Sequence, residues 1–172
     1  MDIILKCRKF DVIRRQVDDD AGKPHTFEYI RHPGAVVVLP ILPGDHIVMI
    51  KNFRHAIDQT LLELPAGTLD REGEDPLDAA HRELEEETGY QAGQMTPLCR
   101  FYPSPGFMSE LLTAYVATDL SKTVQRLEPT ERIIVEEMSA SAALREVRSG
   151  GIVDAKTLIV LMRWAMDRGL ST

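Results

Sequence analysis

The feature that most constrains the fold of this chain is a helix with clear ends between residues 75 and 89. Asp75 has the short acidic side chain that caps a helix N-terminus, Pro76 suits the first helical position, and Gly89 is typical of the residue that ends a helix. The apolar positions that recur with the helical period are Leu77, Ala80 and Leu84. We therefore expect one face of this helix to pack against a core that the rest of the chain supplies.

Three glutamates lie at one edge of this apolar face. Because successive helical residues advance by about 100°, Glu83, Glu86 and Glu87 fall within an arc of roughly 100°. Like charges at these spacings repel, and a bound divalent cation would reverse that cost, since Mg²⁺ prefers hard oxygen ligands. A run of glutamates is also typical of a solvated helix face. These three residues alone leave both interpretations open.

Short strands and two further helices surround this segment. We expect strands at residues 3–17, 25–32, 35–42, 46–51, 98–102, 111–118 and 132–138, and helices at 141–148 and 154–167. The last helix carries an apolar stripe that we assign to core packing, formed by Leu158, Leu161, Met162, Ala165 and Met166. The pattern predicts a fold of mixed α and β elements.

Composition excludes several classes of protein. With 172 residues and 44% hydrophobic residues, the chain can form a globular domain with its own core. A net charge of -7 argues against nonspecific binding to nucleic acid, because neutralising phosphates requires a basic surface. No run approaches about 18 apolar residues, and the N-terminus lacks the order of a signal peptide, so we expect a cytoplasmic protein that does not bind a membrane. Cys7 and Cys99 form no disulfide framework and are expected to be free thiols.

The segment from Gly67 to Tyr90 resembles the signature of the Nudix hydrolases. The residues that match this signature are Gly67, Glu74, Arg82, Glu83, Leu84, Glu86, Glu87, Gly89 and Tyr90. One spacing departs from the family pattern, because six residues and not five separate Gly67 from Glu74. A loop can absorb one residue at little entropic cost, so we expect a bulge there and an intact site.

This resemblance implies a Nudix-type α/β/α sandwich on a mixed sheet, with the Nudix box at residues 67–90 forming a loop, a helix and a loop. It also implies hydrolysis of a nucleoside diphosphate linked to another group, with Mg²⁺ as cofactor and Mn²⁺ or Zn²⁺ as possible substitutes. The implied metal ligands are Glu83, Glu86, Glu87 and the backbone carbonyl of Ala66. Arg82 would orient the glutamates through charge-assisted hydrogen bonds. Such a site suits this chemistry, since a metal neutralises the pyrophosphate and lowers the pKa of an attacking water.

Segments outside the box resemble the ADP-ribose pyrophosphatase branch of the family. Pro105 lies sixteen residues after Gly89 and matches the downstream proline motif of that branch. Further similar segments are residues 52–54, 64–67 and 151–157. The resemblance implies cleavage of ADP-ribose to AMP and ribose 5-phosphate. The alternatives are hydrolysis of another nucleotide sugar or dinucleotide, such as GDP-mannose, FAD or a diadenosine polyphosphate, and a non-catalytic ADP-ribose sensor.

The same resemblance implies residues that act on water and substrate. Glu131 would position or activate the attacking water, with Glu128 as the second choice. Arg54 would bind the substrate phosphates, because a guanidinium presents a bidentate fork to phosphate oxygens. The other implied substrate-binding residues are Phe27, Glu28, Arg31, Glu63, Ser104, Pro105, Gly106 and Glu110. Among these, the ring of Phe27 is available to stack on adenine.

The first part of the chain is polar for a core sheet, and we expect it to form a small antiparallel β lobe at residues 1–33. Residues 34–172 would then form the Nudix hydrolase domain. In the relatives that this chain resembles, the N-terminal strands exchange across a homodimer. We therefore expect a homodimer in which residues near Glu28 reach the site of the other subunit.

Overall fold

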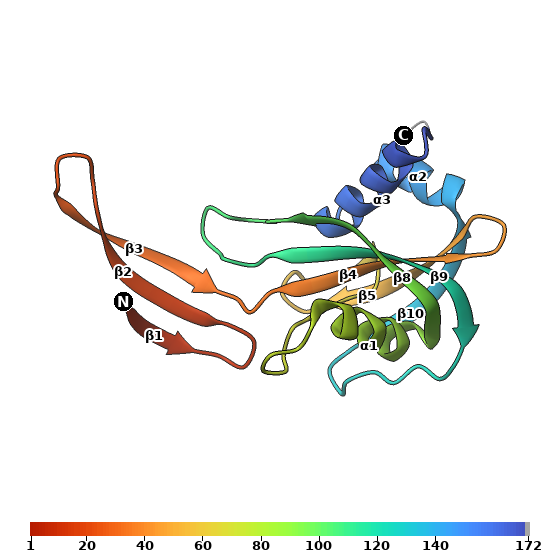
Figure 1. Cartoon of the computed structure of the whole chain (residues 1–172), viewed down its shortest axis with the longest axis horizontal. Helices are drawn as coiled ribbons and strands as arrows, with labels where there is room; N and C mark the ends of the chain where they lie inside the picture. Colours follow the sequence, from red (N-terminus) through yellow and green to blue (C-terminus); the bar gives the residue numbers. More distant parts are fainter. Residues whose placement is uncertain (171–172) are drawn as a thin grey trace.

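The computed structural model of the protein describes residues 1–170. An N-terminal antiparallel sheet of three strands projects from a larger body that holds a sheet of seven strands and three helices (Figure 1). The N-terminal strands are β1 (Asp2–Lys6), β2 (Asp11–Asp18) and β3 (Pro24–Arg31). The strands of the body are β4 (Ala35–Leu42), β5 (His46–Arg54), β6 (Gln59–Glu63), β7 (Ala66–Thr68), β8 (Tyr90–Phe101), β9 (Leu112–Lys122) and β10 (Ile133–Ser139). Its helices are α1 (Pro76–Thr88), α2 (Ala140–Ser149) and α3 (Ala155–Asp167).

The sheet of the body is mixed. Its main path runs β10-β5-β4-β9-β8, with β6 paired to β5 and β7 paired to β4. Strand β4 pairs in parallel with β9, whereas the other pairs are antiparallel. The central strand β4 is buried at every position from Ala35 to Ile41, because both faces of the sheet are covered.

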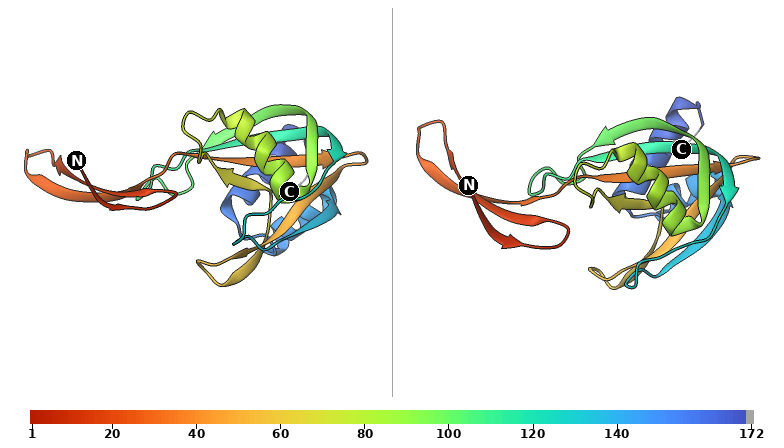
Figure 2. Two further views of the ribbon diagram at one scale, coloured as in Figure 1. Left: turned by 90° about the horizontal axis from the view of Figure 1, so that it is seen from below. Right: turned by 60° about the horizontal axis from the view of Figure 1, so that its bottom comes forward.

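Helices cover the two faces of this sheet, as the views in Figures 1 and 2 show. Successive side chains of a strand point to opposite faces, and β4 therefore contributes to two cores. Val36 and Val38 pack with α1, while Val37 and Leu39 belong to the cluster that includes α2 and α3. This arrangement confirms the predicted α/β/α sandwich with a separate antiparallel N-terminal sheet.

The helix of the Nudix box begins and ends where the sequence predicts. The Asp75 carboxylate accepts the Leu77 N–H at 2.7 Å, and Gly89 ends the helix with a left-handed φ of 68°. The predicted apolar face differs at one position, since Leu77 remains 38% exposed and Ala79 is buried in its place. The small side chain of Ala79 allows the helix to approach the sheet closely.

The predicted stripe of the last helix was wrong at two positions. Met162 and Met166 are 42% and 69% exposed, whereas Val160 and Trp164 are buried beside Leu161. The buried face is rotated toward Val160 and Trp164, because the large Trp164 ring fills the core under β4 and β8. Within residues 1–170, no helix is long and apolar enough to cross a membrane.

Several strand boundaries differ from the predictions. The strand predicted at residues 3–17 is two strands, joined by a turn in which Cys7 N–H donates to Phe10 O at 2.9 Å. This turn contains no Gly or Pro, so the sequence gives no local signal for it. Strand β8 begins at Tyr90 and not at residue 98, and β6 and β7 were not predicted.

The N-terminal sheet is joined to the body by backbone hydrogen bonds. Ile30 N–H donates to Phe107 O at 2.8 Å, and Ser109 N–H donates to Ile30 O at 2.9 Å. The His32 N–H donates to the Ser109 hydroxyl at 3.0 Å. These bonds place the loop that contains Pro105 next to the end of β3.

Candidate active site

Strand β7 brings Gly67 into close contact with Glu83 of α1. A Cβ atom on Gly67 would lie 1.9 Å from Cδ of Glu83, so any side chain at this position would force the Glu83 carboxylate to move. The loop between Gly67 and Glu74, which is one residue longer than the family pattern, contains a turn, with Gly73 at a φ of 74° and Glu74 N–H donating to Arg71 O at 3.0 Å. The Glu74 carboxylate still reaches Arg82, with contacts of 3.0 and 3.2 Å.

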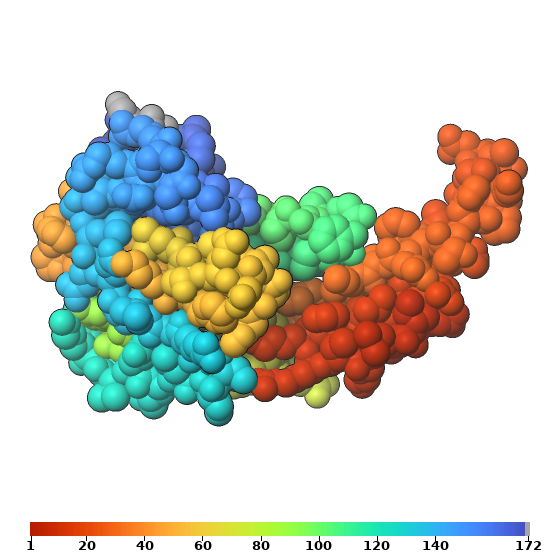
Figure 3. Space-filling view, turned by 180° about the vertical axis from the view of Figure 1, so that it is seen from behind, coloured from red at the N-terminus to blue at the C-terminus, as the bar shows by residue number. Residues whose placement is uncertain are grey.

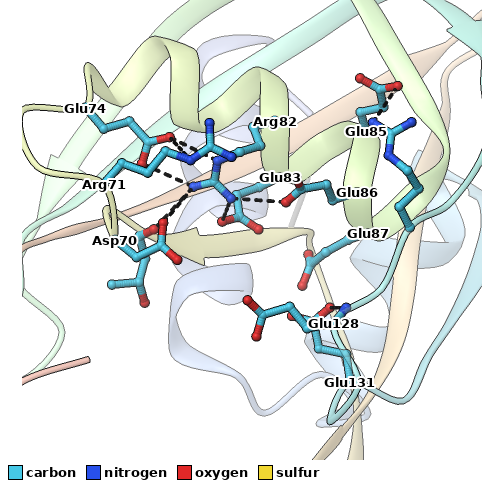
Figure 4. A network of polar contacts seen from close by, with 12 residues as sticks. Asp70, Arg71, Glu74, Arg82, Glu83, Glu85, Glu86, Glu87, Glu128 and Glu131 are labelled. Atoms are coloured by element: carbon cyan, nitrogen blue, oxygen red, sulfur yellow. Dashed lines mark hydrogen bonds and ion pairs between the residues drawn. The ribbon is translucent and has the colours of Figure 1, made fainter. Parts of the chain in front are cut away.

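Arg82 is the centre of the polar network in Figure 4. Its Nη1 donates to Glu83 at 2.6 Å and to Glu86 at 3.1 Å, while Nε and Nη2 bind Glu74. Burial lowers the pKa of Arg82, but the surrounding glutamates outweigh it and raise the pKa above the usual range of arginine. Arg82 therefore stays charged, and its hydrogen bonds hold the neighbouring carboxylates.

Two of the box glutamates are buried. Burial raises the pKa of Glu83 to about 7 and that of Glu87 to about 8, because it disfavours the ionised form. The Glu87 carboxylate accepts the Ala66 N–H at 2.8 Å, which holds α1 against β7. Glu85 points away from this group and pairs with Arg126 at 3.0 Å (Figure 4).

The box residues face a cavity of about 620 Å³. The predicted site residues that line it are Arg54, Ala66, Arg82, Glu83, Glu86, Glu87, Glu128 and Glu131. Glu128 and Glu131 come from the segment between β9 and β10, and the Glu131 carboxylate accepts the Glu128 N–H at 2.8 Å. The fold thus brings the candidate base, the candidate metal ligands and the candidate phosphate-binding arginine to one space.

Arg54 reaches this cavity from the end of β5, where a buried glutamate holds it. Its Nε donates to Glu63 at 2.8 Å and its Nη2 binds the second carboxylate oxygen. Glu63 is fully buried and also accepts a bond of 2.6 Å from Lys156, which binds Asp154 at 2.8 Å. The hydrogen bonds that Arg54 donates to Glu63 raise the pKa of Arg54. Glu63 therefore positions Arg54 and does not line the cavity of the box glutamates.

A second cavity of about 410 Å³ lies beside the first and shares Arg54 with it. Glu63, Glu110 and Lys156 line this second cavity. The Glu110 carboxylate lies 3.7 Å from Nδ1 of His32. Of the two carboxylates that we assigned to substrate binding here, Glu110 has the weaker internal contact.

The predicted residues of the N-terminal sheet lie elsewhere. Phe27 stacks on Tyr29 with ring centroids 6.0 Å apart, in a pocket of about 350 Å³ that Pro105 also lines. Glu28 pairs with Arg14, and Arg31 pairs with Asp11 at 2.6 Å. Within residues 1–170 of a single chain, none of Phe27, Glu28 and Arg31 lines the cavity of the box glutamates.

The Ser-Pro-Gly segment forms a turn. The Ser104 carbonyl accepts the N–H groups of Phe107 and Met108 at 3.3 and 3.1 Å, and Gly106 has open space around its Cα. Of the three residues, Pro105 is the one that lines the aromatic pocket with Phe27. The turn therefore faces the N-terminal sheet.

The residues around the main cavity suit a divalent cation in their chemistry. They offer carboxylate and carbonyl oxygens, the hard ligands that Mg²⁺ binds. Burial raises the pKa of Glu83 and of Glu87, and a cation beside them would favour their ionised form. Among the residues that the structure describes, no three His, Cys, Asp or Glu side chains already form a metal-binding group. Arg82 instead bridges Glu83 and Glu86 in the structure.

Sequence reasoning missed the part of the cavity wall that comes from the N-terminal sheet. Arg8, Lys9 and Phe10 of the β1–β2 turn line the cavity, as do Asn52 and His55 at the end of β5. No local pattern marks the β1–β2 turn, since its role depends on contacts with residues far along the chain. Figure 3 shows the red N-terminal residues against the cyan stretch that follows β9.

Comparison with known proteins agrees with this geometry. Residues 31–150 match the model of the NUDIX domain family. The chain is 40% identical over 169 residues to the ADP-ribose pyrophosphatase of Bacillus subtilis, covering 97% of this chain and 91% of the relative. It is 39% identical over 164 residues to the methanol dehydrogenase activator of Bacillus methanolicus, covering 92% and 88% of the two chains.

More distant relatives extend the comparison. The GDP-mannose pyrophosphatase of Cronobacter sakazakii is 33% identical over 178 residues, covering 95% of this chain and 91% of the relative. A crystal structure described as an ADP compounds hydrolase has the same fold, with a TM-score of 0.83 over 99% of this chain and 94% of that one at 22% identity. The signature residues, their geometry and these matches together show that the chain belongs to the NUDIX domain family.

Proposed function

We propose that this Nudix hydrolase is a divalent-metal-dependent ADP-ribose pyrophosphatase that cleaves ADP-ribose to AMP and ribose 5-phosphate. The observation that carries the proposal is the meeting of the box glutamates, Glu131 and Arg54 around one cavity of about 620 Å³. The choice of ADP-ribose as substrate is supported by the ADP-ribose pyrophosphatase of Bacillus subtilis, which is 40% identical over 97% of this chain.

Glu83, Glu86, Glu87 and the Ala66 carbonyl are the residues that would hold the metal. A bound Mg²⁺ would neutralise charge on the diphosphate and lower the pKa of the attacking water. Arg82 keeps the Glu83 and Glu86 carboxylates facing the same side of α1, so both are available to one cation.

The chain's own residues supply the remaining steps. Arg54 uses Nε and Nη2 to bind Glu63, which leaves Nη1 for a phosphate oxygen of the substrate. Glu131 accepts a proton from water as the water oxygen forms a bond to phosphorus and the bridging P–O bond breaks. One Glu131 oxygen already accepts the Glu128 N–H, which leaves the other oxygen to accept the proton from water.

The proposal includes a homodimer formed through the lobe of residues 1–33. Large apolar side chains of this lobe are exposed in a single chain, among them Ile3 at 50%, Leu5 at 56% and Phe27 at 40%. Covering such a surface favours association. In the dimer, the lobe of one subunit would bring Phe27 and Glu28 to the site of the other. Light scattering on the purified protein should give twice the mass of the chain, and a monomer would contradict this part of the proposal.

Product analysis tests the activity. The purified protein is incubated with Mg²⁺ and, separately, ADP-ribose, ADP-glucose, GDP-mannose, FAD and a diadenosine polyphosphate, with the Glu86→Gln variant as control. We expect AMP and ribose 5-phosphate from ADP-ribose at the highest kcat/KM, and no product in excess chelator. A higher kcat/KM for GDP-mannose would instead favour a GDP-mannose pyrophosphatase, the activity for which the Cronobacter sakazakii relative at 33% identity is named. Binding of ADP-ribose without cleavage of any compound would favour the sensor.

A further inference from the structure

The β1–β2 turn brings positive charge to the cavity of the box glutamates. Cys7 N–H donates to Phe10 O at 2.9 Å and closes the turn, and Arg8 and Lys9 between them line the same cavity as Glu83, Glu86 and Glu87. In Figure 3 the red N-terminal residues lie against the body. The N-terminal sheet therefore forms part of the catalytic cavity of its own chain.

Arg8 is held by an exchangeable partner. Its Nη2 donates to both carboxylate oxygens of Glu128, at 3.0 and 3.2 Å. The Arg8 and Glu128 side chains are 73% and 42% exposed, and ion pairs of this kind contribute little to stability because water screens them. Arg8 can therefore leave Glu128 for another anion at small cost.

The other two arginines of the cavity are each already paired with at least one buried carboxylate. Arg82 binds Glu74, Glu83 and Glu86, and Arg54 binds the fully buried Glu63. Lys9, in contrast, makes no hydrogen bond or ion pair with any residue from 1 to 170 that the structure describes. An anionic substrate that enters this carboxylate-rich cavity would find two cations ready to bind it, Arg8 and Lys9.

We propose that the β1–β2 turn is a phosphate-binding element of the active site, in which Arg8 exchanges Glu128 for an oxygen of the substrate diphosphate and Lys9 adds a second positive charge. The proposal rests on the proposed function only in that the substrate carries a diphosphate. A guanidinium binds phosphate and carboxylate oxygens with the same fork, so the exchange needs no rearrangement of Arg8 beyond its side chain.

The exchange has a consequence for the loop that carries Glu131. In the structure, Arg8 ties Glu128 to the N-terminal sheet, and the Glu131 carboxylate accepts the Glu128 N–H. When a phosphate binds Arg8, Glu128 loses this ion pair, which joins the segment between β9 and β10 to the N-terminal sheet. Substrate binding is thereby linked to the position of the candidate base.

Two variants with opposite expected effects test the proposal. Arg8→Ala removes a phosphate contact, and we expect the Kd and KM for ADP-ribose to rise about tenfold with kcat within about twofold of wild type. Glu128→Gln removes the carboxylate that competes for Arg8, and we expect the Kd to stay unchanged or to fall. If the Arg8–Glu128 ion pair had only a structural role, both variants would disrupt the same pair and would raise the Kd equally.

The control is Lys23→Ala, which removes one positive charge from the turn between β2 and β3 of the same sheet, outside the cavity. The Kd of Lys23→Ala should match that of wild type. A raised Kd in this control would show that any loss of positive charge from the N-terminal sheet weakens binding. Binding is measured by calorimetry in the Glu86→Gln background with ADP-ribose, or with whichever nucleoside diphosphate the panel favours. A change of substrate therefore overturns the proposed function and leaves this test intact. An unchanged Kd in Arg8→Ala, or an equal rise in Glu128→Gln, would overturn the phosphate-binding turn.

Discussion

Replacing Gly67 with alanine should disable the site by displacing one carboxylate. The added Cβ would lie 1.9 Å from Cδ of Glu83 and 2.0 and 2.4 Å from its two oxygens. Ordinary contact begins near 3.4 Å, so the Glu83 carboxylate must retreat by about 1.5 Å. A displacement of about 1 Å in a positioned catalytic group can cost about a hundredfold in rate. We therefore expect kcat to fall by at least about a hundredfold.

The same displacement gives the expected change in stability. Moving Glu83 breaks its 2.6 Å bond to Arg82, and a charge-assisted hydrogen bond between two largely buried groups contributes about 2 kcal/mol. The free energy of unfolding should fall by this amount, which lowers the Tm of a chain of this size by roughly 4–8 °C. Gly67→Ala should therefore remain folded at room temperature, with normal circular dichroism.

Steady-state hydrolysis and thermal unfolding measure the two effects, with Gly22→Ala as the matched control. Gly22 has a φ of 77° and no atom within 4 Å of an added Cβ, so alanine there strains the backbone by about 1–2 kcal/mol without touching a glutamate. Its Tm should fall while kcat stays near wild type. Near-normal kcat in Gly67→Ala, with a Tm close to wild type, would refute the close contact between Gly67 and Glu83.

Three further predictions follow from the charges of the site. In metal-free protein, the pKa values of Glu83 (about 7) and Glu87 (about 8) exceed the ordinary value of 4.5, so these two groups stabilise the fold most below about pH 4.5 and lose that contribution toward pH 8. The Tm should therefore fall between these pH values. An unchanged dependence of Tm on pH in Glu87→Gln would contradict this prediction. Arg54→Ala leaves Lys156 as the one cation bound to the buried Glu63, so the free energy of unfolding in denaturant titrations should fall by about 3 kcal/mol. The KM should also rise, and an unchanged KM would mean that other residues bind the substrate phosphates. Glu86→Gln should lower kcat at least about a hundredfold with little change in Tm, because Glu86 is the most exposed of the three proposed ligands. Near-normal turnover would remove Glu86 from the proposed ligand set.

The helix of the Nudix box was predictable because its signals are local. The Asp75 cap, Pro76 and the left-handed Gly89 each act within one turn of the helix, and the structure shows all three. The glutamates followed from the same helix, since a helix of known ends places Glu83, Glu86 and Glu87 on neighbouring faces. Their burial was not predictable, because it depends on β7 and on the loop that packs over α1.

Other elements depend on contacts that lie far apart in the sequence. Strand β6 is paired with β5 and β7 with β4, and each is too short or too polar for a pattern of its own. The turn at residues 7–10 has no Gly or Pro, so two strands were predicted as one. The predicted positions of Phe27 and Arg31 at the site have no support in a single chain, because neither residue lines the cavity of the box glutamates.

The distribution of charge explains why a site of this kind needs the N-terminal sheet. The body supplies the carboxylates that suit a cation, and each cation that the body places at the cavity, Arg54 and Arg82, is bound to a buried or nearly buried carboxylate. Such pairs are costly to break, because a buried glutamate would lose its compensating charge. A diphosphate is therefore better bound by cations without a buried partner, and Arg8, which pairs with the exposed Glu128, and Lys9, which has no hydrogen-bond or ion-pair partner within residues 1–170, are such cations. Arg8 and Glu128 are 120 residues apart in the sequence, so the pairing of Arg8 with an exposed carboxylate can be recognised only in the folded chain.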